Sequence, residues 1–301
     1  MVDKTIIKSI FEEEFNQIPT LISHIPDKGI TNEIYIVEIL DKRYVIRISP
    51  ESNIAQFEKE NWDMEQAARL GVFIPNTIKL GELESTVYMI QEYVYGLHGT
   101  DISLDKSFIW KELGKYSKTI HSIPTMGFGN YMSSPGVFSG DWVRYVEYNI
   151  QSLTDSDKLL SMNVLNEKQS KRIKMLFENL TEQKFNFGLN HGDLSLKNVI
   201  VNNGRVVLLD WGSSESHIVP HFDIVEVLQS SFEFDFNNQY FRAFISAQDI
   251  SDEEFSSLKP SVDIIMLLRA IDHLRWAIDK KPEKVEHLVE VVSRVLNYMK
   301  I

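Results

Sequence analysis

Hydrophobic positions near the start of the chain predict a small lobe that mixes strands and helices. Residues 3–15 and 54–70 have apolar side chains at the spacing of one helix face, and Gly71 ends the second helix. Runs rich in β-branched and aromatic residues predict strands over residues 33–39, 43–48, 77–80 and 86–92. The order of these elements, two strands, a helix and further strands, indicates a mixed N-terminal lobe.

Beyond residue 95 the pattern becomes mainly helical. Apolar residues recur at helical spacing over residues 106–121, 141–153, 166–181, 221–231, 238–246 and 259–298. One pair of strands is expected to interrupt these helices, at residues 199–202 and 205–209. Residues 122–140 are rich in glycine and serine, which predicts a long loop. We therefore predict an α+β fold with a smaller N-terminal lobe, residues 1–94, and a larger, mainly helical C-terminal lobe, residues 95–301.

Composition narrows the class of protein. The chain has 301 residues and no cysteine, which excludes disulfides, thiolate metal sites and a cysteine nucleophile. No signal peptide or membrane-spanning stretch is visible, so we expect a cytoplasmic protein without a membrane partner. The formal net charge of -12 disfavours a nucleic-acid partner and suits a cationic small molecule, although acidity can also serve solubility alone. The oligomeric state is not readable from the sequence, and a monomer is compatible with it.

A loop near residue 193 has the spacing of a phosphoryl-transfer site. His191 and Asp193 are followed, after four residues, by Asn198, and Asp210 comes after the predicted strand pair. Phosphoryl transfer needs a carboxylate at the attacking hydroxyl and oxygen ligands for magnesium. We predict that Asp193 is the catalytic carboxylate and that Asn198 and Asp210 bind the metal, which the strand pair would bring together. An Asp- and Asn-rich turn that caps its own backbone is the alternative.

Several residues of the predicted N-terminal lobe are candidates for binding a nucleotide. Arg47, on the second strand, would contact phosphates and pair with Glu60 of the following helix, with Glu58 as a competitor. A solvent-facing strand residue is the alternative for Arg47. Phosphates could also meet the turn at Thr31 and Asn32, although an ordinary loop has the same pattern. The segment that leaves the lobe could contact a purine base, and its candidate residues are Met89, Ile90, Glu92 and Val94, although an edge strand packed on the core has the same pattern.

With these motifs in order, the chain resembles the aminoglycoside phosphotransferase family. The resemblance rests on residues 28–35, on residues 60–75, and on residues 191–200 together with 209–212 and 222–224. It implies a two-lobed protein-kinase-like fold, ATP or GTP, and Mg²⁺. It also implies that His191 supports the catalytic loop and that Asp223 braces it. Arg47 departs from the lysine of many members, and residues 127–129 and 141–144 look most like the hygromycin kinase branch.

The resemblance predicts a transferase that moves the γ-phosphoryl group to a hydroxyl of an aminoglycoside-type antibiotic, and thus a role in antibiotic resistance. Acidic and aromatic residues beyond Asp210 are candidates for binding the cationic acceptor: Glu226, Glu233, Asp235, Asp272 and Trp276. For each of these, a solvated helix face is the alternative. A metabolic kinase of the same fold, acting on choline, homoserine, a thio-sugar or a macrolide, remains open. A nucleotide-binding pseudokinase is less favoured, because Asp193, Asn198 and Asp210 are all present.

Overall fold

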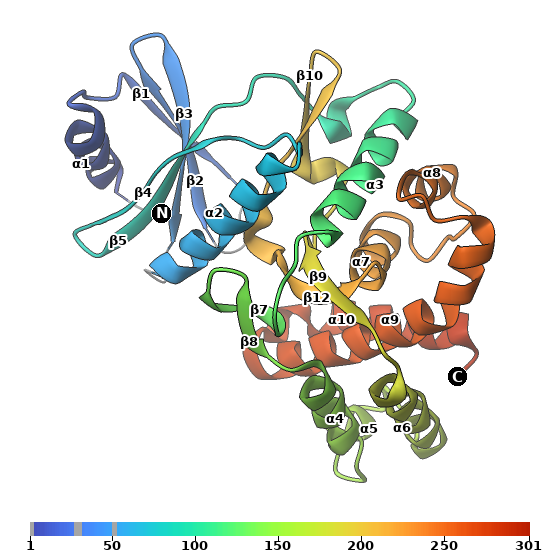
Figure 1. Cartoon of the computed structure of the whole chain (residues 1–301). Coiled ribbons are helices and arrows are strands. Elements are labelled where there is room, and N and C mark those ends of the chain that lie inside the picture. Colours follow the sequence, from blue (N-terminus) through green and yellow to red (C-terminus); the bar gives the residue numbers. More distant parts are fainter. Residues whose placement is uncertain (1–2, 27–31, 50–52) are drawn as a thin grey trace. The chain divides into compact units, whose positions relative to one another are not determined.

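The computed structural model describes residues 3–26, 32–49 and 53–301 of the chain (Figure 1). Contacts within the chain divide it into two compact units. The first unit comprises Met1–Leu104 and Leu196–Ser213, and the second comprises Asp105–Ser195 and Ser214–Ile301. The first unit is built mainly on sheets and the second mainly on helices, which confirms the predicted α+β class.

The first unit contains an antiparallel sheet of five strands in the order β1-β2-β3-β5-β4. Its strands are β1 (Leu21–Ile25), β2 (Glu33–Ile39), β3 (Lys42–Ser49), β4 (Thr77–Leu83) and β5 (Thr86–Glu92). Four of these strands were predicted from the sequence. Strand β1 was not, because it is short and lies at the sheet edge, where its burial does not alternate cleanly.

The alternation of side chains along the strands separates two faces of this sheet. Helix α1 (Lys4–Phe15) packs on one face, with Ile10 and Phe11 against Tyr35 and Ile90. Helix α2 (Ile54–Arg69) packs on the other face, where Phe57 contacts Val87 and Met89. Figure 1 shows the two helices on opposite sides of the strands. Because successive strand residues point to opposite faces, Arg47 lies on the same face as α2.

A second, three-stranded sheet completes the first unit. It joins β6 (Leu97–His98) to the predicted strand pair, β10 (Val199–Asn202) and β11 (Arg205–Leu208), in the order β11-β10-β6. Short 3₁₀ turns flank these strands: η1 (Gly99–Asp101), η2 (Leu196–Asn198) and η3 (Trp211–Ser213). The first unit therefore extends past residue 94 and includes a later segment, because β6 is hydrogen-bonded to β10. The lobe boundary that we placed after residue 94 stays a prediction.

Most helices of the second unit follow the predicted spans, and the short helix α5 (Lys158–Ser161) was not predicted. The other helices are α3 (Ser107–His121), α4 (Trp142–Ser152), α6 (Glu167–Glu182), α7 (His221–Ser231), α8 (Gln239–Ala247), α9 (Asp252–Lys280) and α10 (Val285–Met299). The predicted stretch 259–298 is divided into α9 and α10 by η4 (Pro282–Lys284). Helix α9 begins earlier than predicted, because Ser251 and Glu254 form a capping box at its N-terminus. No described helix is both long enough and apolar enough to cross a membrane.

The predicted long loop over residues 122–140 is wrong. This segment contains the hairpin β7 (Phe128–Ser134) and β8 (Val137–Gly140), which joins β9 (Asn186–Asn190) and β12 (Glu215–Val219) in a sheet ordered β8-β7-β12-β9. Glycine allows the two strands to approach each other here, because a Cβ at Gly127 would lie 1.7 Å from the Phe138 carbonyl oxygen. Gly136, at φ 75°, occupies the hairpin turn. The glycine content of this segment thus reflected close packing of two strands and not a long loop.

Candidate active site

A buried ion pair lies at the centre of the first unit. The guanidinium Nη1 of Arg47 is 2.5 Å from Glu60 Oε2, and its Nη2 is 3.7 Å from Asp210 Oδ1. Arg47 is 7% exposed and Glu60 is fully buried, so the solvent-facing alternative for Arg47 is wrong. Glu58, the predicted competitor, is exposed. Burial lowers the pKa of Arg47, but the charges of Glu60 and Asp210 outweigh it and leave that pKa raised.

The predicted strand pair brings Asn198 and Asp210 to one place. Val199 pairs with Leu208, and the Leu209 N–H donates to the Asn198 carbonyl at 2.8 Å, so the two ends of the hairpin meet. Asp210 adopts a left-handed conformation with φ 57°, which is uncommon outside glycine and directs its side chain toward Arg47. The carbonyl oxygen of Gly212 accepts from Gln56 Nε2 at 3.1 Å, which ties the Asp-x-Gly turn to α2.

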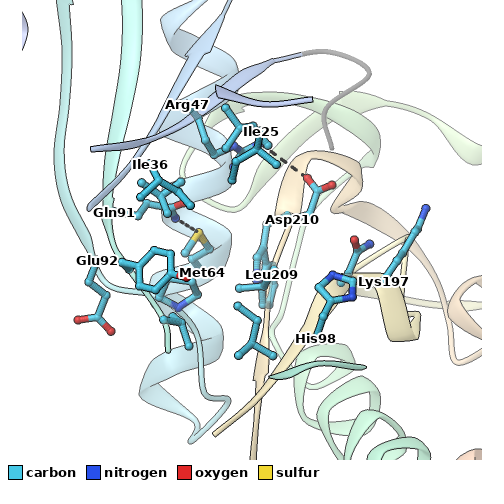
Figure 2. A pocket seen from close by; sticks show the side chains of 18 residues that line it. Ile25, Ile36, Arg47, Met64, Gln91, Glu92, His98, Lys197, Leu209 and Asp210 are labelled. Carbon is cyan, nitrogen blue, oxygen red and sulfur yellow. Dashed lines mark hydrogen bonds and ion pairs between the residues drawn. The ribbon is translucent and has the colours of Figure 1, made fainter. Parts of the chain in front are cut away.

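A cavity of about 260 Å³ adjoins this ion pair (Figure 2). Its walls are mostly apolar, with Ile36, Val45 and Met64 among them, and Arg47 and Asp210 face each other at one side. Asn198 also lines the cavity. A pocket with apolar walls and a few convergent polar groups is the usual form of a small-molecule site. Four of the predicted site residues, Arg47, Glu60, Asn198 and Asp210, are therefore placed at or beside one cavity.

The remaining predicted nucleotide contacts differ in their placement. Glu92 and Val94 line the cavity. Ile90 is fully buried on the α1 face of the sheet, so the next residue, Gln91, takes the wall position on the α2 face. Asn32 is half-buried just before β2 and is not among the described residues that line the cavity. Thr31 lies outside the described residues.

Sequence analysis did not assign a role to two polar residues of this cavity, Lys197 and His98. Lys197 precedes Asn198 in the loop motif, and its side chain is exposed at the edge of the cavity. Its position beside a metal-ligand candidate was the signal that could have identified it. His98 has no such signal, because it reaches the cavity through the pairing of β6 with β10. Its Nδ1 lies 2.7 Å from Thr100 Oγ1.

In the second unit, Asp223 holds the loop that carries Asp193. The carboxylate of Asp223 is fully buried and accepts from the Gly192 N–H at 2.9 Å and from the His191 N–H at 3.4 Å. His121 Nε2 lies 2.9 Å from Asp223 Oδ2, the oxygen that also accepts from the His191 N–H. Burial raises the pKa of Asp223, but the hydrogen bond and charge of His121 outweigh it and lower that pKa. The Asp193 N–H donates to His191 Nδ1 at 3.3 Å, so His191 acts on the backbone of the loop.

Two of the residues predicted to bind the acceptor are joined to internal partners. Glu226 forms an ion pair with Arg269, whose Nη2 lies 2.7 Å from Glu226 Oε2. Asp272 accepts from Tyr145 Oη at 3.0 Å and from Asn149 Nδ2 at 3.3 Å.

The other three acceptor candidates, Glu233, Asp235 and Trp276, are exposed. Asp235 Oδ1 caps the Asn237 N–H. The Trp276 ring lies 5.8 Å from Lys284 Nζ. On α9, Asp272 therefore contacts α4 and Trp276 faces Lys284, while the neighbouring Asp279 is 2.6 Å from Lys158 Nζ.

A second cavity, of about 390 Å³, lies in the second unit between α7, α9 and α10. Glu226 and Glu233 line it together with Arg269, Arg294 and two histidines, His273 and His287. We call it the mixed-charge cavity. The formal charges of the two glutamates and two arginines that line the cavity cancel.

The described residues contain no group of three or more His, Cys, Asp or Glu side chains that could hold a metal alone. A magnesium ion at Asn198 and Asp210 would have one amide and one carboxylate from the protein. This donor set fits the ion, because Mg²⁺ is usually held by one or two protein groups together with substrate phosphates and water.

A family model described as the phosphotransferase enzyme family matches residues 24–260 of the chain. A comparison with curated protein sequences finds no significant match. Among solved structures, the GDP complex of aminoglycoside 2'-phosphotransferase-IIIa is similar, with a TM-score of 0.73 at 13% identity over 99% of this chain and 100% of that one.

Two further solved structures are aminoglycoside phosphotransferases with bound ligands. A ternary complex of a thermostable mutant of APH(4)-Ia with AMP-PNP and hygromycin B has a TM-score of 0.67 at 17% identity, over 97% of this chain and 98% of that one. A complex with GDP and kanamycin has a TM-score of 0.69 at 14% identity, over 97% and 98%. At these identities the matches establish the protein-kinase-like fold, and they include enzymes bound to different aminoglycosides.

Proposed function

Since the chain belongs to the phosphotransferase enzyme family, we propose that it transfers the γ-phosphoryl group of a nucleoside triphosphate to a hydroxyl of a small molecule. One observation carries this proposal. The Arg47–Glu60 ion pair, Asn198 and Asp210 come from three separate parts of the sequence and lie at one cavity. A nucleotide-binding phosphotransferase needs a cation and metal ligands together at such a place.

The nucleotide would occupy the cavity of the first unit. Its base would lie among the apolar walls, against the backbone of residues 91–94, and its phosphates would meet Arg47. Glu60 holds the guanidinium in position, so little reorganisation is needed when the phosphates arrive. Asn198 and Asp210 would hold Mg²⁺, which when bound neutralises charge on the phosphates. The similar structures contain AMP-PNP or GDP, which supports a nucleotide here and leaves ATP and GTP as the two candidates.

Asp193 would act on the acceptor. Its carboxylate accepts a hydrogen bond from the attacking hydroxyl and orients the oxygen toward the γ-phosphorus. The new O–P bond forms as the bond to the β–γ bridging oxygen breaks, the nucleoside diphosphate leaves, and the hydroxyl proton passes to Asp193 and then to solvent. The transition state is loose, so positioning and charge neutralisation supply most of the rate. Asp223 keeps the loop backbone in place through Gly192 and His191.

For the acceptor, an aminoglycoside is one of two candidates. The similar structures bound to hygromycin B and kanamycin support it, and so does the net charge of -12. A metabolic alcohol is the second candidate, because the mixed-charge cavity contains two arginines, which a polycation would not favour. Glu226, Glu233, Asp235, Asp272 and Trp276 remain proposals as acceptor contacts. The hygromycin kinase branch, a monomeric state and a cytoplasmic location also remain proposals.

The test is transfer of phosphate by the purified full-length protein. We would incubate it with Mg²⁺, with ATP or GTP, and with a panel of aminoglycosides and small alcohols, and detect the added phosphate by mass. The Asp193→Ala variant is the control for enzyme-dependent transfer. A protein that binds nucleotide in the presence of Mg²⁺ yet phosphorylates no alcohol at all would instead be a pseudokinase.

A further inference from the structure

The mixed-charge cavity has the size of a ligand site. Its volume of about 390 Å³ lies within the range of roughly 300–1,000 Å³ common for small-molecule pockets. Its walls come from α7, α9 and α10 and from the turn after α7. The amide oxygen of Gln229 in this wall is buried and has no hydrogen-bond partner among the described residues. Such a group is costly unless a ligand or water satisfies it.

The two ion pairs of this cavity differ in strength. Arg269 contacts both carboxylate oxygens of Glu226, and its guanidinium lies 4.7 Å from the Phe222 ring centre. These two charges are therefore engaged with each other. Arg294 Nη1, in contrast, lies 3.9 Å from Glu233 Oε2, and the two side chains are 45% and 84% exposed. A guanidinium has five N–H donors, so Arg294 retains donors for a ligand.

The protonation states of His273 and Glu226 do not give the cavity a net negative charge. Burial, with the charges of Arg269 and Lys284, lowers the pKa of His273 to about 3, so this ring is neutral at pH 7. Burial raises the pKa of Glu226 to about 7 against the opposing effect of Arg269. Glu226 lies three residues after Asp223 on α7, and Asp223 accepts from the Gly192 N–H next to Asp193, which places this wall of the cavity near the catalytic loop.

We propose that the acceptor binds in the mixed-charge cavity and that it is a small hydroxylated carboxylate, whose anionic group is held by Arg294. This inference rests on the proposed phosphoryl transfer and names its substrate class. Arg294 would bind the carboxylate through a charge-assisted, bidentate pair. The hydroxyl of the same molecule would be the group that receives phosphate.

A polycation fits this cavity poorly. Each of its ammonium groups would meet the positive charges of Arg269 and Arg294, and Glu226 is already paired with Arg269. Two further acidic residues of α9, Asp272 and Asp279, contact Tyr145 and Lys158 instead. The acidity of the whole chain is therefore not concentrated in this cavity.

The experiment compares acceptors and one arginine variant. The full-length protein would be assayed with Mg²⁺ and ATP or GTP on L-homoserine and D-glycerate as carboxylates, glycerol as a neutral alcohol, choline, and kanamycin and hygromycin B as polycations. The same acceptors would be tested with Arg294→Gln. The matched control is Arg69→Gln, since Arg69 is also exposed and also loosely paired, to Glu65 at 3.5 Å. Binding of each acceptor would be measured separately by calorimetry.

We expect phosphate on a carboxylate acceptor, with a KM that rises about 10- to 100-fold in Arg294→Gln, as for loss of a charged hydrogen bond. The kcat and the KM for nucleotide should stay within about twofold, and Arg69→Gln should match the wild type. The amide of the same acceptor should bind more weakly to the wild type and be insensitive to Arg294→Gln.

The outcomes separate the two proposals. Transfer to kanamycin, hygromycin B or glycerol that is equal in wild type and Arg294→Gln would overturn the carboxylate inference and leave the kinase proposal intact. Arg294-dependent binding of a carboxylate without any transfer would support the cavity ligand and overturn the kinase proposal. Neither transfer nor Arg294-dependent binding would overturn both.

Discussion

The buried Arg47–Glu60 pair should cost far more to break from one side than to remove altogether. In Arg47→Met, Glu60 would keep a buried carboxylate whose remaining described partner is Gln56 Nε2 at 3.5 Å. Leaving a buried charge uncompensated costs about 3–5 kcal/mol. In Glu60→Gln, Arg47 keeps Asp210 at 3.7 Å, and the new amide can still accept a hydrogen bond. We therefore expect a smaller loss, about 1–3 kcal/mol.

The double variant Arg47→Met with Glu60→Met removes both charges and keeps apolar volume between β3 and α2. Its cost should be at most about 2 kcal/mol, which is less than the cost of Arg47→Met alone, and Glu60→Met is the second single variant of the cycle. Urea unfolding of the wild type, both single variants and the double variant measures these values. Trp62 and Trp211 lie in the first unit and can serve as reporters if the remaining tryptophans are replaced.

Additive costs, with a double variant as unstable as the sum of the singles, would refute the idea that the pair is a coupled buried unit. So would an Arg47→Met variant no less stable than Glu60→Gln. Nucleotide affinity provides the functional comparison, because Arg47→Met and the double variant both lack the cation. Both should bind nucleotide more weakly even where the double variant regains stability.

The other predictions concern the catalytic loop, the metal ligands and the buried histidines. Asp193→Ala should lower kcat by about 10²–10⁴-fold and keep the affinity for nucleotide. Asp210→Ala should lower kcat too, and its nucleotide affinity should no longer depend on Mg²⁺, which titration calorimetry can check. Asp223→Asn weakens the hold on Gly192 and should lower kcat by about 100-fold with little change in the KM for nucleotide; an unchanged kcat would contradict its positioning role. Burial, together with the charge of His121, lowers the pKa of His221 to about 4 despite a backbone hydrogen bond at Val219. Because the unfolded chain takes up the proton first, the folded state loses stability as pH falls below about 6.5, by up to about 2 kcal/mol at pH 5. Between pH 7.5 and pH 5, the wild type should therefore lose unfolding free energy relative to His221→Gln. A difference between the two proteins that does not change with pH would argue against a buried neutral His221.

The placement of Arg47, Asn198 and Asp210 at one cavity was largely predictable because its signals are local. The strand and helix that carry Arg47 and Glu60 were identified by periodicity, and the hairpin that joins Asn198 to Asp210 was identified by two apolar runs flanking a turn. Ile90 was assigned to the wrong side of its strand. The error is one residue, and because side chains along a strand alternate between the two faces, a shift of one residue changes the face of the sheet.

The loop predicted over the glycine-rich residues 122–140 was wrong for a different reason. Gly127 in a loop and Gly127 packed against the Phe138 carbonyl have the same sequence signature, because both need a residue without a side chain. The β7–β8 hairpin also pairs with β12, which is distant along the chain. No local pattern specifies that pairing.

Patterns along the chain are thus sufficient to identify the reaction class, the catalytic and metal-ligand candidates and most helices and strands, since these depend on backbone geometry over a few neighbouring residues. Partners of the acidic residues depend instead on distances between elements far apart in sequence. Glu226 meets Arg269 and Glu233 meets Arg294 through the packing of α7 and its following turn against α9 and α10. The electrostatic character of a site depends on all the charges within reach, so the pairing of these glutamates with arginines in a mixed-charge cavity was decided by the tertiary structure.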